Sequence, residues 1–404
     1  MQLCKIYEII DNTTNMAAGD TSSGRPSWET FVQCANSICD VFKVSSFYEN
    51  QLRALYNFIC GEDVFVNLPT GYGKSLIYQM APLVHSWMHK NISQFCWKKD
   101  PILLIISPST TLMQDQVNML TSLGLKAAFV TSDQQPNITK EIEAGKFMFV
   151  FISPESTLES FRYIFESDMY KTNLIGIAVD EVHCVAQWGT SNNNKKKSAF
   201  RSWYSRLNEI RSMVNDLPFI ALTATATEQT KQKIFDILEF ETPVQICECP
   251  NKANIRYSAQ KIDNSEPIIE NFKSVINELI KKGKDSTRRI IYCQTVKQCS
   301  HLFRMFELEL ESHLCYGEVA PCNRLVEMMH SGSPSTVKSH VLDQFGDSAK
   351  HLRILIATIA YGMGLDCKGV TQVIHFCPSQ KIESYMQESG RCRRKGEQSD
   401  ALLL

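Results

Sequence analysis

The sequence of 404 residues lacks the features of a zinc-bound, disulfide-linked or membrane-spanning protein. None of its 15 cysteines are spaced as Cys-x-x-Cys, the closest pair being Cys247 and Cys249, so we expect reduced thiols and no structural zinc. No basic-then-apolar signal pattern opens the chain, and no apolar run approaches the length of a membrane span. These absences predict an intracellular protein, in the nucleus or the cytoplasm.

Neither positive nor negative charge is in excess. The 42 Lys and Arg residues nearly balance the 43 Asp and Glu residues, giving a formal net charge of −1. The overall charge therefore indicates no partner, and a surface that binds nucleic acid would have to be local. With 44% hydrophobic and 21% charged residues the composition is that of an ordinary globular protein, and the length favours two or three domains.

What the chain does have is a phosphate-binding pattern at residues 63–78, DVFVNLPTGYGKSLIY. It predicts a buried strand and a glycine turn that leads into a helix. Such a turn directs backbone N–H groups at an anion, while a Lys adds charge and a Ser hydroxyl can hold Mg²⁺. Leu68 occupies the place of the strict pattern's first glycine, so a glycine-rich hairpin or helix cap is the alternative. The expected site residues are Thr70, Gly71, Gly73, Lys74 and Ser75.

Apolar runs alternate with helical spacing along the chain, which predicts parallel sheets covered on both faces, with ligands beyond the carboxyl ends of the strands. We therefore predict an α/β protein with a lead-in and helix at 1–41, which packs on the next domain, and two tandem parallel-sheet domains at 42–250 and 251–404. The expected strands are 64–66, 102–106, 147–152, 174–179, 219–222, 288–293, 352–357, 371–376 and 401–404. The expected helices include 28–42, 112–123, 228–238, 265–282, 295–310 and 380–388.

An acidic pair, Asp180 and Glu181, follows the expected strand at 174–179. At a strand end Asp180 could hold Mg²⁺ through its water shell, and Glu181 could orient and deprotonate an attacking water. A solvated loop or a helix cap is the alternative for such a pair taken alone. Because the phosphate-binding pattern belongs to the same predicted sheet, we favour the catalytic interpretation.

Three further segments could complete a nucleotide site. Gln51 could contact an adenine edge through its amide, the alternative being an exposed helix glutamine. Thr223 and Thr225, after the expected strand at 219–222, could link the site to the second domain. The alternative is an N-cap for the next helix, and both can hold, with Thr227 as the cap. The segment QESGRCRRKG, residues 387–396, could project arginines into a triphosphate site, the alternative being a solvated charge run.

Nucleic acid could bind where basic and aromatic residues are interleaved, at residues 187–206. Cations for phosphates and rings for bases suit a single strand, and a loop followed by a core-packing helix face is the alternative. The segment 107–116, after the strand at 102–106, could track a nucleic-acid backbone as well. The residues of the first segment are Gln187, Trp188, Lys195, Lys196, Lys197, Phe200, Arg201, Trp203, Tyr204 and Arg206.

In order and spacing these motifs resemble those of superfamily 2 helicases and, within them, the RecQ-like DNA helicases, over residues 42–404. The resemblance is carried by NLPTGYGKSLIYQ, SPSTTLMQDQV, ISPE, DEVHCVAQWG, ALTATAT, IIYCQT, IATIAYGMGLD and QESGRCRRKG. It implies two RecA-like domains with ATP and Mg²⁺ in the cleft between them. It also implies ATP-driven unwinding of single-stranded or forked DNA, usually 3′ to 5′, in nuclear DNA repair and recombination.

The resemblance also implies roles for individual residues. Those implied to bind nucleotide and Mg²⁺ or to activate water are Gln51, Thr70, Gly71, Gly73, Lys74, Ser75, Asp180 and Glu181. Those implied to couple DNA to hydrolysis are His183, Gln187, Trp188, Phe200, Arg201, Thr223 and Thr225. Those implied to complete the ATP site from the second domain are Asp366, Gln387, Arg391 and Arg394.

The sequence departs from the family's pattern at several places. Tyr48 stands where the family often has an arginine before the adenine glutamine, and an Asn- and Lys-rich insertion follows Gly189. Arg393 and Lys395 replace the glycine and the aspartate of the usual GRAGRDG, which could misplace Arg394. The family's zinc-binding, winged-helix and HRDC regions are not expected in this sequence.

Two alternatives stand beside the helicase interpretation. One is an ATPase or translocase that single-stranded DNA or RNA stimulates but that separates no strands, which unwinding assays on DNA and RNA forks would discriminate. The other is a pseudo-helicase that binds nucleic acid or a partner, with a damaged 387–396 segment. The presence of Lys74, Asp180 and Glu181 argues against the second alternative.

Reverting Arg393 to glycine tests the damaged segment. We expect R393G to raise an existing rate of ATP hydrolysis, because a long side chain at a tight glycine position strains the turn that carries Arg394. Steady-state hydrolysis with single-stranded DNA measures this. If R393G instead created activity where the wild type has none, the natural chain would be the degenerate form.

Overall fold

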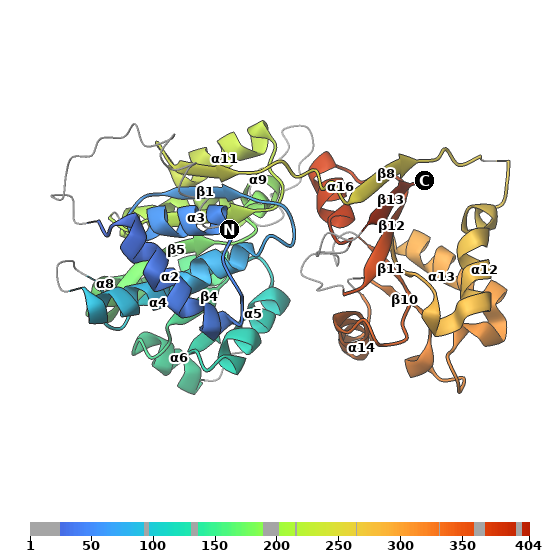
Figure 1. The fold of residues 1–404 in the computed structure, drawn as a ribbon, viewed down its shortest axis with the longest axis horizontal. Helices are drawn as coiled ribbons and strands as arrows, with labels where there is room; N and C mark the ends of the chain where they lie inside the picture. Colours follow the sequence, from blue (N-terminus) through green and yellow to red (C-terminus); the bar gives the residue numbers. More distant parts are fainter. Residues whose placement is uncertain are drawn as a thin grey trace.

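The computed structural model describes residues 25–92, 97–130, 136–188, 202–214, 216–263, 265–330, 332–358, 368–392 and 398–404. In these ranges the chain forms one β-sheet of seven strands and one of six, each covered by helices (Figure 1). The strand pairings in both sheets are parallel. The prediction of an α/β protein with two parallel sheets is therefore confirmed.

The first sheet has the strand order β3-β4-β2-β5-β6-β1-β7. The five predicted strands form its interior, whereas β3 and β7, which the sequence did not predict, are short strands at its two edges. The strands are β1 (Val64–Asn67), β2 (Ile102–Ile106), β3 (Ala127–Phe129), β4 (Phe149–Ile152), β5 (Leu174–Val179), β6 (Phe219–Thr223) and β7 (Val244–Cys247).

The first sheet is covered by short and medium helices. The predicted lead-in helix, α2, buries Phe31 and Ile38 in the core beside β1, which confirms that it packs on this sheet. The α-helices are α2 (Trp28–Phe42), α3 (Glu49–Ile59), α4 (Lys74–Asn91), α5 (Thr110–Ser122), α6 (Pro136–Glu143), α7 (Pro154–Leu158), α8 (Asp168–Asn173), α9 (His183–Trp188), α10 (Asn208–Met213) and α11 (Glu228–Leu238). The 3-10 helices are η1 (Arg162–Glu166) and η2 (Ser202–Arg206).

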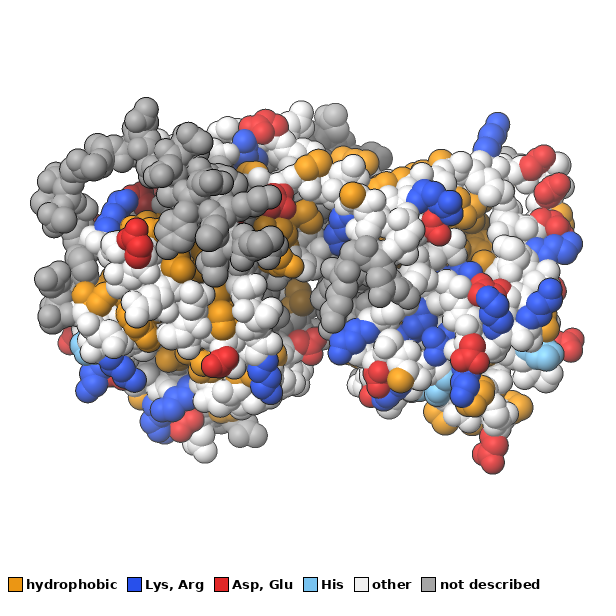
Figure 2. All heavy atoms as spheres, in the orientation of Figure 1, with side chains coloured by type: hydrophobic (Ala, Val, Ile, Leu, Met, Phe, Trp, Pro, Cys, Tyr) orange, Lys and Arg blue, Asp and Glu red, His pale blue; other side chains and the backbone are white. Residues whose placement is uncertain are grey.

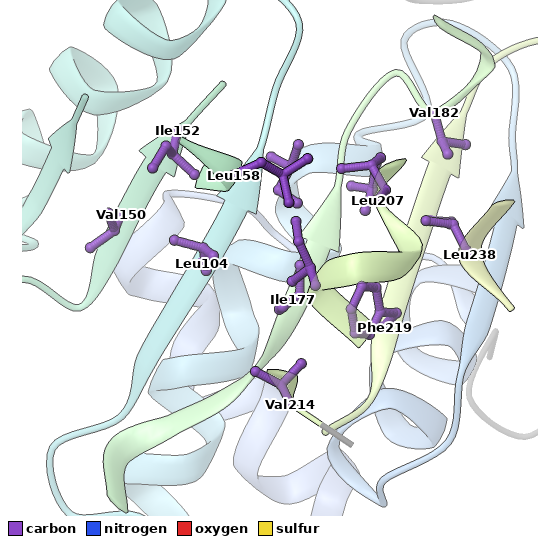
Figure 3. Close-up of a cluster of buried hydrophobic side chains, with 14 of the residues drawn as sticks. Leu104, Val150, Ile152, Leu158, Ile177, Val182, Leu207, Val214, Phe219 and Leu238 are labelled. Carbon is purple, nitrogen blue, oxygen red and sulfur yellow. The ribbon is translucent and has the colours of Figure 1, made fainter. Parts of the chain in front are cut away.

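Apolar side chains cover both faces of the first sheet, because successive residues of a strand point to opposite faces. Val64 and Val66 of β1 pack on one face with α2, α3 and α4, whereas Phe65 between them packs on the other. Figure 3 shows part of this second face, where Leu104 and Ile177 of the strands lie among side chains of the covering helices. Each buried Leu or Ile contributes about 1.5–3 kcal/mol, so this core is the main source of stability.

The second sheet has the strand order β10-β11-β9-β12-β13-β8. Four of its strands match predicted ones, and β8 and β10, at the two edges, were not predicted. The strands are β8 (Ile255–Ala259), β9 (Arg288–Cys293), β10 (Val326–Met329), β11 (Ile354–Thr358), β12 (Val370–Phe376) and β13 (Ser399–Leu403). The α-helices are α12 (Lys273–Lys282), α13 (Val296–Leu310), α14 (Ser335–Gly346) and α16 (Ile382–Ser389), and the 3-10 helices are η3 (Ile268–Phe272), η4 (Gly283–Asp285), η5 (Glu311–Leu314) and η6 (Pro321–Asn323).

The helix predicted at 265–282 was wrong in its first part, because η3 precedes α12 there. Pro267 accepts a bond from the N–H of Glu270 at 3.0 Å, the tighter spacing of a 3-10 turn. Across the described ranges, no helix combines the length and the apolar character that a bilayer crossing requires. Figure 2 shows basic and acidic side chains interspersed over the visible face, in keeping with a net charge near zero.

The ion pair between Glu278 of α12 and Arg289 of β9 gives a pH-dependent stability. Burial opposes ionisation of Glu278, but hydrogen bonds from Arg289 and Thr287 outweigh it and lower its pKa from 4.5 to about 2. This stabilisation is complete above the unfolded-state pKa and is lost as the pH falls from about 4.5 towards 2. We expect Glu278→Gln to lower the free energy of unfolding by about 1–3 kcal/mol at pH 7, and by less at pH 4 and below.

Urea unfolding at several pH values measures the difference between wild type and variant. Glu270→Gln is the matched control, because Glu270 pairs with Lys273 on the surface, where both side chains are well exposed. We expect that control to change stability by less than about 1 kcal/mol. A difference for Glu278→Gln that stayed constant between pH 7 and pH 3 would contradict the assignment.

Candidate functional site

The glycine loop, residues 68–75, joins the carboxyl end of β1 to the start of α4. Gly71 and Gly73 have φ values of 85° and 79°, a left-handed conformation that glycine adopts without strain. The Lys74 ammonium donates to a loop carbonyl, that of Leu68, at 2.9 Å, so the loop curls around its own lysine. With the N-terminus of α4 at its end, the loop has the geometry of an anion site.

Gln51 of α3 ties that helix to the glycine loop. Its side chain is buried, and its Nε2 donates to the carbonyls of Tyr72 at 2.9 Å and Gly73 at 3.1 Å. Its Oε1 accepts from the N–H of Tyr48 at 2.8 Å. Both ends of the amide predicted to contact adenine are therefore bonded to the chain's own backbone in this structure, and the adenine contact stays a prediction.

An aromatic pair lies beside this glutamine. The rings of Tyr48 and Tyr72 are 4.8 Å apart between centroids, and Tyr48 is 60% exposed. Glu248, which follows β7, accepts from the Tyr72 hydroxyl at 2.8 Å and from the Asn50 amide at 2.6 Å. Sequence reasoning missed Tyr72 and Glu248, because the strand before Glu248, β7, was not predicted either.

The acidic pair lies directly after β5, close to the glycine loop. Oδ1 of Asp180 accepts from the N–H of Glu181 at 2.9 Å, and its Oδ2 accepts from the buried Tyr78 hydroxyl of α4 at 3.2 Å. Burial and the neighbouring Glu181 charge raise the pKa of Asp180 to about 6, although the Lys74 charge opposes this. The pair therefore favours a proton or a cation beside it. Tyr78 is a further site residue that the sequence did not reveal.

Glu181 is held in an unusual conformation. Its φ is 48°, the left-handed region that a non-glycine residue occupies at a cost of about 1–3 kcal/mol, and such strain is common at functional sites. Its Oε2 is buried without a hydrogen bond, 3.4 Å from Nδ1 of His183. Burial lowers the pKa of His183 although the Glu181 charge opposes this, so the ring is neutral at pH 7.

Thr223, at the end of β6, connects the acidic pair to the next segment. Its hydroxyl lies 3.1 Å from Nδ1 of His183 and accepts from the N–H of Thr225 at 3.2 Å. The Thr225 hydroxyl is buried without a hydrogen bond. The predicted coupling residues Thr223 and His183 thus touch each other directly. Thr227, as predicted, caps α11.

The second sheet brings its own residues to the glycine loop. Gln387 of α16 and Arg391 just after it are both buried, with exposures of 8% and 4%. Between them, a Cβ added to Gly390 would lie 3.3 Å from Oγ1 of Thr70 in the glycine loop. Lys252, in the connection between the sheets, donates to the carbonyl of Gly390 at 2.9 Å.

Several predicted site residues cannot be placed. Phe200, Arg201, Asp366 and Arg394 lie outside the described residues, as do Lys195, Lys196 and Lys197. The backbones of Gln187 and Trp188 belong to α9. Their proposed contacts therefore stay predictions.

The described part of the predicted nucleic-acid segment contains core residues. Tyr204 is 1% exposed and belongs to the hydrophobic core, which favours the packing alternative for this ring. Arg206 lies over the Trp203 ring at 4.6 Å and bonds to Glu209 at 2.5 Å. In the second candidate segment, Gln116 of α5 accepts from Gln79 of α4 at 2.5 Å, so α5 is attached to the helix that starts at the glycine loop.

A pocket of about 440 Å³ lies elsewhere, at the carboxyl ends of β8 and β13. It is lined in part by Tyr257, Ser379, Lys381 and Tyr385, and none of the predicted site residues line it. It borders α16 on the side of Tyr385. We therefore treat it as separate from the site described above.

Comparison with known proteins agrees with the motifs. Residues 48–234 match the DEAD/DEAH box helicase family, and residues 270–396 match the helicase conserved C-terminal domain. The chain is 30% identical over 372 residues to the RecQ-like DNA helicase BLM of Xenopus laevis, covering 90% of this chain. It is 29% identical over 414 residues to the ATP-dependent DNA helicase Q1 of Rattus norvegicus, covering 99% of this chain. The chain therefore carries both domains of a helicase core and is similar in sequence to RecQ-like helicases.

The similarity concerns the helicase core of longer proteins. The chain spans 24% of the length of the Xenopus relative and 60% of the rat relative. Among solved structures, a DUF1998 helicase MrfA bound to DNA and AMPPNP superposes with a TM-score of 0.69 at 16% identity, covering 94% of this chain and 51% of that one. This likeness shows that the chain shares the two-sheet fold of that structure.

Gly73 offers a sharp test of the loop geometry. A Cβ there would lie 2.7 Å from Nε2 of Gln51, so Gly73→Ala must displace a buried, bonded amide as well as strain a positive φ. Gly61→Ala is the matched control, because Gly61 also has a positive φ, 89°, but nothing lies within 4 Å of its added Cβ. We expect both variants to lose about 1 kcal/mol of stability, and only Gly73→Ala to bind a fluorescent ATP analogue about tenfold or more weakly. Equal affinities for both would contradict the site.

Proposed function

We propose that this chain is the ATP-hydrolysing core of a RecQ-like DNA helicase that moves along single-stranded DNA. The observation that carries the proposal is the convergence of three elements: the glycine loop, the Asp180–Glu181 pair, and the turn after α16, where Gly390 approaches Thr70. The names of the relatives, which include ATP-dependent DNA helicases, support the same activity. We also propose that the chain acts on DNA in the nucleus, in repair and recombination.

ATP would occupy the cleft between the sheets. The Lys74 ammonium would leave the loop carbonyls to which it is bonded. It would then bind the phosphates together with the backbone N–H groups of the glycine loop. Gln51 would exchange its backbone bonds for an adenine edge, and the exposed Tyr48 ring would offer a stacking surface where relatives often have arginine. Arg391 and Gln387, carried by α16, would meet the phosphates from the second sheet.

The residues present fit a divalent cation. Burial and the neighbouring Glu181 charge raise the pKa of Asp180, the condition that a bound cation relieves. Mg²⁺ prefers few protein ligands and several waters, which suits one carboxylate and one hydroxyl, those of Asp180 and Ser75. When bound, Mg²⁺ would neutralise charge on the phosphates.

Glu181 would orient and deprotonate the attacking water. Its buried Oε2 has no hydrogen bond of its own, and the neutral His183 ring lies beside it. Because His183 also touches Thr223, a shift of Thr223 would change the position of Glu181. The contacts from α5, α9 and residues 189–201 to DNA would deliver that shift, with 3′ to 5′ movement as in the family.

Steady-state ATP hydrolysis with and without single-stranded DNA tests the proposal. We expect clear stimulation by DNA, less by RNA, and a loss of about a hundredfold or more in kcat for Glu181→Gln with ATP still bound. Lys74→Ala is expected to lose ATP binding as well. Unwinding of a forked DNA then separates a helicase from a translocase.

Hydrolysis no faster than that of Glu181→Gln, with ATP still bound, would overturn the motor assignment. Stimulation by RNA but not by DNA would overturn the substrate assignment. The first result would favour a pseudo-helicase that binds nucleic acid or a partner, and the second an ATPase or translocase that RNA stimulates.

A further inference from the structure

A carboxylate from the second sheet is bonded to a helix of the first. Glu383, in the first turn of α16, accepts on Oε1 from the hydroxyls of Thr227 at 3.1 Å and Thr230 at 3.0 Å. Thr227 is the N-cap of α11, an 11-residue helix. The carboxylate therefore meets two donors and the positive end of a helix at once. Figure 1 shows α16 on the side of the second sheet that faces the first.

This contact holds a charged group. Burial opposes ionisation of Glu383, but hydrogen bonds from its own backbone N–H and from the two threonines lower its pKa. Glu383 is thus ionised at neutral pH. Hydrogen bonds to an ionised acceptor are stronger than neutral ones, so this contact can bear on how the sheets dock.

Two predicted site residues share the side of α16 that carries Glu383. Glu383, Gln387 and Arg391 are each four residues apart, a spacing that places them along one face. The turn stays helical as far as Arg391, whose N–H donates to the carbonyl three residues earlier at 3.1 Å. Next to Arg391, Gly390 approaches Thr70 of the glycine loop. Fixing Glu383 therefore fixes where this face of the helix, and Gly390 after it, meets the first sheet.

The Glu383 contact is also connected, through α11 and the end of β6, to the Asp180–Glu181 pair. α11 follows β6, whose last residue, Thr223, lies 3.1 Å from the His183 ring. His183 lies 3.4 Å from Oε2 of Glu181. One carboxylate thus joins the helix that carries Arg391 to the segment that orients Glu181.

We propose that Glu383 is a positioning residue, which docks α16 on the N-terminus of α11 and thereby aligns Arg391 and Gln387 with the glycine loop. The inference rests on the proposed function, since it assumes that the loop binds ATP. Glu383 itself touches no reacting atom. We therefore expect the loss of Glu383 to lower kcat and to weaken the docking of the second sheet on the first. The first binding of ATP should not change, because the glycine loop of the first sheet provides it.

Two variants disrupt the contact from opposite sides: Glu383→Ala removes the acceptor, and Thr230→Val removes one of its two donors while keeping the side-chain shape. We expect each to lower the DNA-stimulated kcat about tenfold, the size expected for loss of bonds to a charged group, with ATP affinity without DNA changed less than about twofold. The double variant should lose no more than Glu383→Ala alone, because without the carboxylate Thr230 makes no bond to α16. Thr230→Ser, which keeps the hydroxyl, should retain the wild-type kcat.

Glu228→Ala is the matched control. Glu228 is a carboxylate at the same helix N-terminus, but it is exposed and pairs with Lys231 within α11 at 2.7 Å. Its loss should leave kcat unchanged. Small-angle X-ray scattering with a non-hydrolysable ATP analogue gives a second measurement that needs no hydrolysis. We expect a compact wild type and a larger radius of gyration for Glu383→Ala and Thr230→Val.

These readouts separate the inference from the proposed function. A wild type that hydrolyses no ATP but becomes compact only with an intact Glu383 contact would refute the motor and support the docking role. An active wild type whose variants keep its kcat and its compactness would refute the docking role alone. Additive losses in the double variant would also refute it, because they would show two independent contacts.

Discussion

The site depends on the parallel register of β5, β6 and β1 at the centre of the first sheet. Asn67 of β1 is paired with Thr223 of β6, and the residue after β1 bonds to the Thr223 carbonyl at 3.2 Å. Asp180, after β5, donates its N–H to the end of β2 at 2.9 Å. The glycine loop, the acidic pair and the threonine segment therefore leave the sheet at one edge. A slip of one residue in any of these strands would turn their side chains to the wrong face.

The interior of both sheets could be read from the sequence, and most of the edges could not. Strands such as 102–106 are apolar throughout because both of their faces are buried. β8, with the sequence IRYSA, is exposed at several positions and carries no such run. β3, with three residues, is too short to show a pattern. The edge strands are set by their neighbours in the sheet, which a single sequence does not display.

The same division holds in the site. Lys74, Asp180 and Glu181 could be predicted, because each follows a strand within a recognisable motif. Tyr78 and Glu248 could not, since their partners lie far away in the chain and only the folded sheet brings them together. Gln51 shows a different limit: the sequence identified the residue, but its present bonds to the backbone depend on the loop conformation.

The connection between the two sheets is fastened at both of its ends. Glu248, its first residue, holds Tyr72 inside the glycine loop, and Lys252 holds Gly390 beside Arg391. The connection is therefore held against both sheets, and its conformation depends on that of the glycine loop. A force that pulled the sheets apart would load the bonds of Glu248 to Tyr72 and Asn50 and the bond of Lys252 to Gly390, so mechanical tension on the protein would bear on the shape of its glycine loop.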